Sequence, residues 1–300
     1  MRSSALLLVA ARLLVGTSSA SETRLAARID ALIKPTGADV AVVFGRVDGA
    51  ASLAIGADEP FHAASTMKVP VMIELFREAD AGTLSLDEPL PVRNEFHSIV
   101  DGSVYQLDVG DDSDALVYKA IGTTMTLGQL CDAMITVSSN FAANLLIERL
   151  GVQNIRATVA KLGAGGMNVL RGVEDDKAYA KGLNNTTTAR ALFTLLQAIA
   201  RGKAVSPRAD AEMVAILKRQ SFNNAIPAGL PPGTPVAHKT GNITKIHHDA
   251  AIVYGPHPYV LVVLVRGIED EKQSAALIAA ISREVWNETS VSEDGSVRAK

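Results

Sequence analysis

Segments with the pattern of β-strands occur near both ends of this 300-residue chain, whereas the middle has the pattern of helices. Near the N-terminus, residues 39–47 are rich in Val and Ala, and Asp48-Gly49 is a typical hairpin turn into a second strand at residues 51–55. Strand patterns return near the C-terminus, at residues 236–240, 250–254 and 259–265. Because strands need partners and a buried face, these distant segments predict one antiparallel sheet built from both ends of the chain.

Helical periodicity fills the remainder. Apolar residues recur at helical spacing in residues 21–34 and 271–288, next to the two groups of strands. The Thr126–Gln129 capping box and the Ser206-Pro207 pair mark helix starts in the middle. We predict an α/β (α+β) fold in which helices flank the antiparallel sheet and an all-helical domain is inserted. The predicted limits are residues 21–62 and 221–290 for the α/β domain, 63–220 for the helical domain and 291–300 for a flexible tail.

The first 20 residues have the pattern of a secretory signal peptide. A basic start at Arg2 precedes an apolar stretch over residues 5–15, and the small residues 18–20 are typical of a cleavage site. Arg12 interrupts the apolar stretch, so an ordinary N-terminal helix is the alternative. A signal peptide predicts a periplasmic or secreted protein. No later run of about 20 apolar residues occurs, so we expect no membrane span in the mature chain.

Composition argues against several classes of function. The formal net charge is −3 and no basic stripe occurs, so we expect no nucleic-acid partner. Cys131 is the single cysteine, which rules out an intramolecular disulfide, and its apolar surroundings predict a buried, inert thiol. His247-His248-Asp249 lacks further ligands at metal spacing, and the acidic residues 111–114 have the pattern of a solvated loop. We therefore expect neither a metal nor another cofactor.

Three short patterns carry the chemistry, and the first is Ser65-Thr66-Met67-Lys68. Ser65 is expected at the start of a helix, where free backbone N–H groups and the helix dipole favour a developing negative charge. Lys68 lies three residues later on the same helical face, and a lysine kept from water can accept the serine proton. Alone, such a pattern more often marks a capping serine and a solvated lysine.

The second pattern is Ser138-Ser139-Asn140, at the junction between two predicted helices. Buried polar side chains at such a junction need hydrogen-bond partners, and a substrate amide could supply them. Local helix capping is the alternative for this segment alone.

The third pattern is Lys239-Thr240-Gly241, at the end of a predicted strand. Lys239 and Thr240 can hold a carboxylate, and Gly241 permits close approach of a ligand to the backbone. Each pattern alone is weak. The three in this order predict one active site for acyl transfer, built from distant segments.

Together these patterns resemble the penicillin-recognising serine hydrolases, and most closely the class A β-lactamases. The resemblance runs from about residue 26 to residue 286, and residues 134–144 are particularly similar to the corresponding class A segment. The family fold, an α/β domain with an inserted all-helical domain, agrees with the arrangement predicted above. The resemblance implies a small-molecule β-lactam substrate and a monomer, the usual state in this family.

The resemblance also implies a role for each motif residue. Ser65 would be the acylated nucleophile, Lys68 its activating partner, and Ser138 the donor of a proton to the leaving nitrogen. The substrate-binding residues that it implies are Asn140 for the side-chain amide, Lys239 and Thr240 for the carboxylate with Gly241 beside them, and Asn242, whose N–H would form the oxyanion hole with that of Ser65.

Glu174 is the predicted general base for deacylation. Class A enzymes use a loop glutamate to position the hydrolytic water, and residues 171–174 lie where that loop should be. Glu174 follows Ser138 by 36 residues, close to the family's spacing. The alternative is a surface acid within the charged run 174–176.

Three departures from the class A pattern bear on the mechanism. Ser139 stands where aspartate is usual. Ala178 stands four residues after Glu174, where the family has a water-holding asparagine, and this argues for slower deacylation. The basic residue that many class A enzymes place after the third pattern has no clear match, and Asp249 falls near that point. The nearest basic replacements are Lys245, His247 and His248.

The leading hypothesis is a serine β-lactamase that hydrolyses the β-lactam amide through an acyl-serine intermediate. One alternative is a D,D-peptidase or esterase with the same nucleophile, acting on peptidoglycan or small esters. The other is a β-lactam-binding module that is acylated without turnover.

Overall fold

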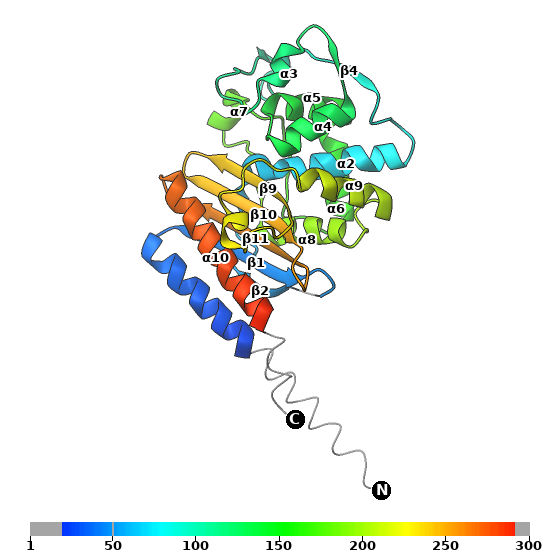
Figure 1. Ribbon diagram of the computed structural model, residues 1–300. Helices are drawn as coiled ribbons and strands as arrows, with labels where there is room; N and C mark the ends of the chain where they lie inside the picture. Colours follow the sequence, from blue (N-terminus) through cyan, green and yellow to red (C-terminus); the bar gives the residue numbers. More distant parts are fainter. Residues whose placement is uncertain (1–19, 50, 292–300) are drawn as a thin grey trace, which may run out of the picture.

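The computed structural model describes residues 20–49 and 51–291. Its main sheet has five strands in the order β2-β1-β11-β10-β9, and all neighbouring strands are antiparallel. Because β1 pairs with β11, the two ends of the chain form one sheet, as predicted (Figure 1). The strands are β1 (Asp39–Arg46), β2 (Ala51–Ile55), β9 (Val236–Ile243), β10 (Ile246–Val253) and β11 (Tyr259–Arg266).

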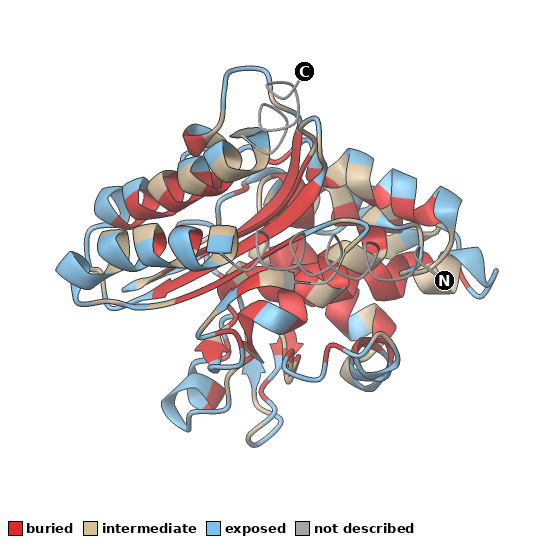
Figure 2. Ribbon diagram, turned by 90° about the horizontal axis from the view of Figure 1, so that it is seen from below, coloured by how far each residue is buried: buried red, intermediate tan, exposed pale blue. Residues whose placement is uncertain are grey.

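Two layers of helix cover this sheet. The first helix (residues 20–33) and α10 (Glu271–Val291) lie on one face, and α8 (Ala189–Ala200) lies on the other (Figure 1). Strand β11 is therefore buried on both sides. Its alternate residues pack into the two separate cores, which explains its unbroken apolar sequence (Figure 2).

The hairpin between β9 and β10 is longer than predicted. The sequence predicted strands that end at Thr240 and begin again at Ala250, but the strands pair as far as Ile243 and Ile246. Residues 241–249 are mostly polar or glycine, so they lack the apolar pattern of a strand. Pairing across the hairpin overrides this weak local preference. The third motif, residues 239–241, therefore lies within the paired part of the hairpin, opposite residues 248–250.

The middle of the chain forms a helical part beside the sheet (Figure 1). The capping box at Thr126 and Gln129 and the N-cap at Ser206 are confirmed. The predicted residue limits of the two domains remain predictions. The remaining helices are α2 (Lys68–Asp80), α3 (Leu116–Lys119), α4 (Leu127–Thr136), α5 (Asn140–Leu150), α6 (Val152–Lys161), α7 (Asp176–Ala180) and α9 (Pro207–Leu217), with 3-10 turns at η1 (Lys34–Thr36), η2 (Ala64–Met67) and η3 (Ile226–Gly229).

Short strand pairs accompany these helices. Strand β3 (Phe61–His62) pairs with β8 (Thr186–Thr187) at the boundary between sheet and helices. The helical part also contains two pairs that the sequence did not predict, β4 (Pro89–Pro91) with β7 (Thr124–Thr126) and β5 (Phe96–His97) with β6 (Val104–Tyr105).

The terminal predictions fall mostly outside the described residues. This is true of the predicted signal peptide except for Ala20, and of residues 292–300 of the predicted tail. Helix α10 ends at Val291, so it runs three residues beyond the predicted end at Glu288. Within the described residues, no helix is both long enough and apolar enough to span a bilayer.

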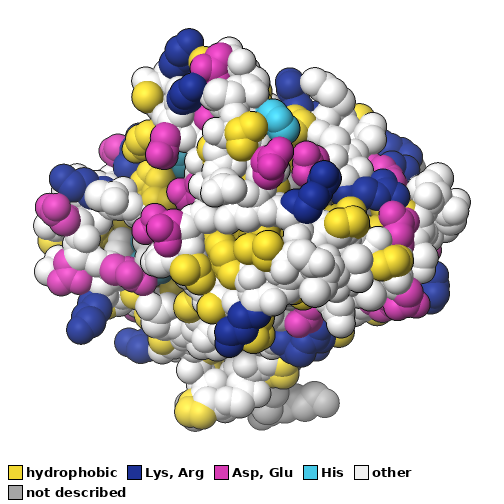
Figure 3. All heavy atoms as spheres, turned by 90° about the horizontal axis from the view of Figure 1, so that it is seen from above, with side chains coloured by type: hydrophobic (Ala, Val, Ile, Leu, Met, Phe, Trp, Pro, Cys, Tyr) yellow, Lys and Arg dark blue, Asp and Glu magenta, His cyan; other side chains and the backbone are white. Residues whose placement is uncertain are grey.

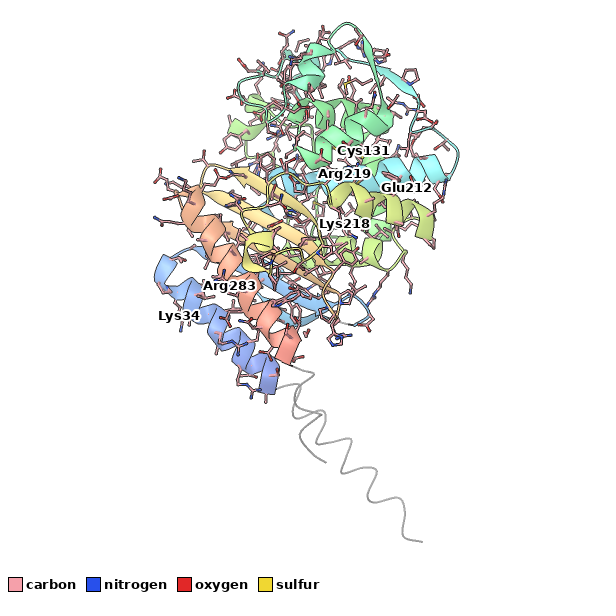
Figure 4. All side chains as sticks on the ribbon, viewed as in Figure 1. Lys34, Cys131, Glu212, Lys218, Arg219 and Arg283 are labelled. Atoms are coloured by element: carbon pink, nitrogen blue, oxygen red, sulfur yellow. The ribbon has the colours of Figure 1, made fainter. Side chains whose placement is uncertain are left out.

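Cys131 lies on α4 and is fully buried, as predicted (Figure 4). Burial raises the pKa of its thiol to about 12, so little reactive thiolate is present near neutral pH.

Candidate active site

The three sequence motifs meet where η2 packs against β9. Ser65 lies in η2, directly before α2, and Lys68 is the first residue of α2. The Ser65 Oγ is 3.0 Å from the Lys68 Nζ. Ser138 lies in the junction between α4 and α5, and Lys239 lies on β9. Sequence positions up to 174 residues apart thus form one cluster around the Ser65 hydroxyl.

Lys68 is fully buried and has more neighbouring oxygens than its hydrogens can serve. Its Nζ is 2.6 Å from the Ser138 carbonyl, 2.7 Å from the Asn140 Oδ1, 3.0 Å from the Ser65 Oγ and 3.3 Å from the Ser138 Oγ. The carbonyl and the amide oxygen can only accept. A neutral amine would satisfy both with its two N–H groups and keep a lone pair for the Ser65 proton.

Burial favours this neutral amine. It lowers the pKa of Lys68 from 10.5 to about 7, and the negative charges of Asp112 and Glu174 offset part of the effect. Burial also lowers the pKa of Lys239 well below its usual value, and the neighbouring Lys68 lowers it further. Two buried lysines next to each other cannot both carry a charge without strong opposing charges.

The Ser138 hydroxyl lies between the two lysines. Lys239 donates to it at 3.0 Å and Lys68 at 3.3 Å, so a proton can be replaced at Ser138 Oγ from either side. Lys239 also donates to the Thr240 carbonyl at 2.9 Å. Its Nζ is fully buried, and Lys239 lines neither of the two cavities described below, so it acts on the cleft through Ser138.

Three functional segments contain a strained backbone. Ala64, Ser138 and Glu174 have φ angles of 45°, 61° and 59°, in the left-handed region that favours glycine. Such residues each cost about 1–3 kcal/mol and persist where the surroundings fix them. Ser138 and Glu174 are predicted catalytic residues, and Ala64 directly precedes Ser65. The backbone is therefore strained at the positions that orient the catalytic side chains.

Gly241 allows β9 to approach the nucleophile. A Cβ at this position would lie 3.1 Å from the Thr66 Cγ2, 3.2 Å from the Ala64 Cβ and 3.3 Å from the Ala63 carbonyl. The sequence predicted that Gly241 makes room for a ligand. The atoms nearest to such a Cβ belong to the segment that carries Ser65, and the predicted approach of a ligand to Gly241 stays a prediction.

Glu174 and the nucleophile Ser65 line the same cavity, of about 290 Å³, together with Asn140. Asn140 donates from Nδ2 to the Glu174 Oε1 at 2.9 Å while its Oδ1 accepts from Lys68. Burial raises the pKa of Glu174, and Asp111 and Asp176 add to the rise. The cavity is large enough for a water molecule between the carboxylate and Ser65.

The loop that carries Glu174 is clamped by side chains that the sequence did not identify as functional. Asn144 on α5 accepts from the Val173 N–H at 2.7 Å and donates to the Val173 carbonyl at 3.0 Å. Arg171 donates to the Leu183 carbonyl at 2.7 Å. The Asn185 amide accepts from the Arg171 N–H and donates to the Arg171 carbonyl. Asn144 thus fixes the residue directly before Glu174, and Asn185 joins the two arms of the loop to each other.

Ala178 lies on α7 and is fully buried. Its methyl group cannot hold a water, so the departure noted in the sequence is present in the folded chain. Asn140 provides a carboxamide hydrogen bond to Glu174 from another direction.

A second cavity, of about 360 Å³, extends from Ser65 along β9 and is lined also by Thr240, Asn242 and His247. His247 is 4% exposed, and its Nδ1 has no hydrogen-bond partner among the described residues. Burial lowers the pKa of its imidazole, so the ring is neutral near pH 7. Ser65 and Asn242, whose N–H groups form the predicted oxyanion hole, line both cavities.

Of the three basic residues considered as replacements after the third motif, only His247 lines this cavity. His248 is fully buried and bonded to the backbone of His62 and Val265. Lys245 lies at the hairpin turn and pairs with Glu269 at 3.8 Å.

Asp249 is turned away from the cleft. Its carboxylate is buried and accepts from the Ile226 N–H at 3.0 Å, and it contacts the His238 ring at 2.9 Å. The described part of the chain has no group of three or more His, Cys, Asp or Glu side chains placed to hold a metal. Acidic and basic side chains are interspersed over the face of the molecule shown in Figure 3.

The acidic run at residues 111–114 corrects one prediction. Asp112 is not simply solvated, because its carboxylate accepts from the Asn140 N–H at 3.0 Å and from the Phe141 N–H at 2.9 Å. No local sequence signal indicates this contact, since 28 residues separate Asp112 from Asn140.

Comparisons with known proteins agree with this geometry. The sequence model described as the beta-lactamase enzyme family matches residues 24–289. A protein named Beta-lactamase from Mycobacterium tuberculosis (strain ATCC 25177 / H37Ra) is 26% identical over 307 residues, which cover 91% of this chain and 93% of that protein.

Two solved structures show the same fold. PBP-A is 29% identical and has a TM-score of 0.78, with 90% of this chain and 97% of PBP-A covered. The ancestral class A beta-lactamase called GNCA is 27% identical and has a TM-score of 0.75, with 88% of this chain and 99% of the ancestral chain covered. The chain therefore belongs to the beta-lactamase enzyme family and is a hydrolase of the serine β-lactamase type with the class A fold.

Proposed function

We propose that this protein hydrolyses the β-lactam amide in two steps through an ester on Ser65. The observation that carries the proposal is the 3.0 Å contact between the Ser65 Oγ and a buried Lys68 amine whose N–H groups have other acceptors. Lys68 takes the Ser65 proton as Oγ attacks the lactam carbonyl. The N–H groups of Ser65 and Asn242 stabilise the oxyanion that forms.

Collapse of this intermediate breaks the lactam C–N bond. Ser138 gives its hydroxyl proton to the departing nitrogen, and the proton held by Lys68 moves to the Ser138 Oγ. Lys239 stabilises the developing charge on Ser138 from the opposite side. The atoms balance. One C–O bond forms and one C–N bond breaks, the lactam nitrogen gains the Ser138 proton, and Ser138 regains a proton that came from Ser65 through Lys68.

Deacylation uses Glu174. A water in the cavity between Glu174 and Ser65 gives a proton to the carboxylate and attacks the ester carbonyl. The C–Oγ bond breaks, and the proton returns from Glu174 to the Ser65 Oγ. Asn140 orients the carboxylate through its 2.9 Å hydrogen bond.

Substrate binding follows the two cavities. The β-lactam carboxylate lies at Thr240, next to Lys239 on β9, in the cavity that His247 also lines. Asn140 holds the side-chain amide of the substrate, and Gly241 sets the distance between β9 and Ser65. No metal or cofactor takes part in these steps. The protein acts as a monomer after export, in the periplasm or outside the cell, with residues 1–20 as the signal.

Turnover of a chromogenic cephalosporin tests this function. The wild-type chain is expected to hydrolyse it, and Ser65→Ala is expected to lose essentially all turnover. Ser85→Ala is the matched control, because Ser85 is an exposed serine whose hydroxyl accepts from the nearby Asp87 N–H. Equal turnover in Ser65→Ala and wild type would contradict the proposal.

A β-lactam-binding protein that is acylated without turnover is the second candidate. It is favoured by one observation, the buried Ala178 where a water-holding carboxamide is expected. A pulse of penicillin followed by dilution separates the two functions. Release of the adduct within seconds to minutes supports the hydrolase, and an adduct that persists for hours supports the binding protein.

A further inference from the structure

The second motif has Ser139 in the place of an aspartate, and a carboxylate from another segment occupies the end of the same helix. Asp112 lies in the loop between β6 and α3. Its Oδ1 accepts from the Asn140 N–H at 3.0 Å and its Oδ2 from the Phe141 N–H at 2.9 Å. The Ser139 hydroxyl also reaches the Oδ2, at 3.4 Å.

These contacts satisfy the start of α5 in two parts. The Ser139 hydroxyl, as N-cap, accepts from the Ala142 N–H. The N–H groups of Asn140 and Phe141 would otherwise have no intrahelical acceptor. A carboxylate at this end of a helix is further favoured by the helix dipole. Asp112 therefore accepts from the two N–H groups that the Ser139 hydroxyl, already bonded to the Ala142 N–H, leaves without an acceptor.

The loop that delivers Asp112 is fixed on both sides. Ser113 donates to the Val137 carbonyl at 2.5 Å, at the end of α4. Asp114 accepts from the Leu116 N–H at 2.8 Å, at the start of α3. Residues 112 and 113 thus bind both ends of the α4–α5 junction, which contains the strained Ser138.

We propose that Asp112 is a positioning residue, which supplies the carboxylate missing from the second motif and holds Ser138 and Asn140 against Lys68. This inference rests on the proposed function, because its effect on rate is an effect on acylation of Ser65. Asp112 lines neither of the two cavities at Ser65. It acts through the junction whose carbonyl and amide oxygens receive the two shortest contacts of Lys68, 2.6 Å and 2.7 Å.

The charge of Asp112 has a second effect, on Lys68. Asp112 and Glu174 both raise the pKa of Lys68 against the larger lowering by burial, and Lys239 is the other titratable group of the cluster. Loss of the Asp112 charge lowers the pKa of Lys68 further. Because acylation needs neutral Lys68, a variant without this charge keeps a larger share of its maximum acylation rate at low pH. The maximum rate itself is smaller, because Ser138 and Asn140 are held less well.

The test exchanges the carboxylate between the two positions. Asp112→Asn is expected to slow acylation by a fluorescent penicillin about 10- to 100-fold, the range for a lost hydrogen bond to a charged group. The pH at which the acylation rate falls, as Lys68 becomes protonated, is also expected to be lower in this variant. Asp112→Asn combined with Ser139→Asp is expected to recover most of the rate and to return the pH dependence, because an N-cap aspartate restores a carboxylate at the start of α5 and can accept from the Phe141 N–H.

Asp108→Asn is the matched control. Asp108 lies in the same loop, and within the described residues its carboxylate accepts only the local Gly110 N–H. This variant is expected to acylate like the wild type. The proposal is overturned if Asp112→Asn also acylates like the wild type, or if the exchange variant folds and shows no recovery.

A measurement independent of acylation separates this proposal from the proposed function. In ¹⁵N NMR spectra, Asp112→Asn is expected to shift the Asn140 and Phe141 amide protons upfield and to lower the titration midpoint of Lys68. If penicillin never acylates the wild type, the proposed function fails, and these shifts still decide the role of Asp112. Unchanged shifts and an unchanged Lys68 midpoint would overturn it.

Discussion

The acylation rate is expected to depend on the ionisation of Lys68. Burial lowers the pKa of this lysine from 10.5 to about 7. At pH 7 about half of the molecules then carry a neutral amine, compared with about one in 3,000 for an ordinary lysine. The buried environment therefore increases the fraction of active base about 1,500-fold.

The pH profile follows directly. Only the neutral amine accepts the Ser65 proton, so acylation rises with pH, reaches half of its maximum near pH 7 and levels off above about pH 8. Below about pH 6 the rate falls tenfold per pH unit. His62 and His247 also line the cavities, but burial lowers the pKa of both rings, so neither accounts for a limb near 7.

Quenched-flow acylation by a fluorescent penicillin from pH 5 to pH 9 measures this limb. Glu174→Gln is the informative variant. It removes a charge that raises the pKa of Lys68, so the limb is expected to move to lower pH while acylation continues. A flat profile in the wild type would refute the reasoning. So would a limb that disappears in Glu174→Gln together with most of the rate, because Glu174 would then be the acylating base.

Three further predictions concern deacylation by Glu174, the packing of Gly241 and the role of His247. Glu174→Gln is expected to slow deacylation about 10²- to 10⁴-fold, so that intact-mass spectrometry finds the adduct at steady state, and a bare protein during normal turnover would exclude Glu174 as the base. Gly241→Ala is expected to push β9 from the Ser65 segment and lower acylation at least about tenfold, whereas Gly165→Ala, whose Cβ would meet no atom within 4 Å, should leave it unchanged. His247→Gln is expected to raise the KM for carboxylate-bearing substrates, because His247 lines the cavity at Thr240. An unchanged KM would argue against contact between His247 and the carboxylate.

The sheet could be predicted because its central strands are buried on both faces. Strand β11 has an unbroken apolar sequence for this reason, and β1 is similar. The polar ends of β9 and β10 could not be predicted, because Asn242 and His247 gain their strand geometry from each other across the hairpin. Local preference indicates little where the pairing is decided by tertiary contact.

In the active site, too, some features could be predicted from the sequence and others depend on tertiary contacts. The nucleophile and its partners follow from three motifs, since Ser65 and Lys68 lie on adjacent turns and the chemistry requires those residue types. The carboxylate at the start of α5 comes from Asp112, far along the chain, so no motif contains it. Asn144 and Asn185 have ordinary positions in sequence, as a helix residue and as part of a capping run. Only the folded chain shows that their amides hold the Glu174 loop.

The central claim is that Ser65 forms and then releases an ester with a β-lactam. Time-resolved intact-mass spectrometry after mixing with benzylpenicillin tests it most directly, with peptide mapping of the quenched protein. The account predicts an adduct of the mass of the whole penicillin, located on the peptide that contains Ser65, which disappears as penicilloic acid accumulates. A chain that stays unmodified while the penicillin remains intact, or an adduct on another residue, would contradict it.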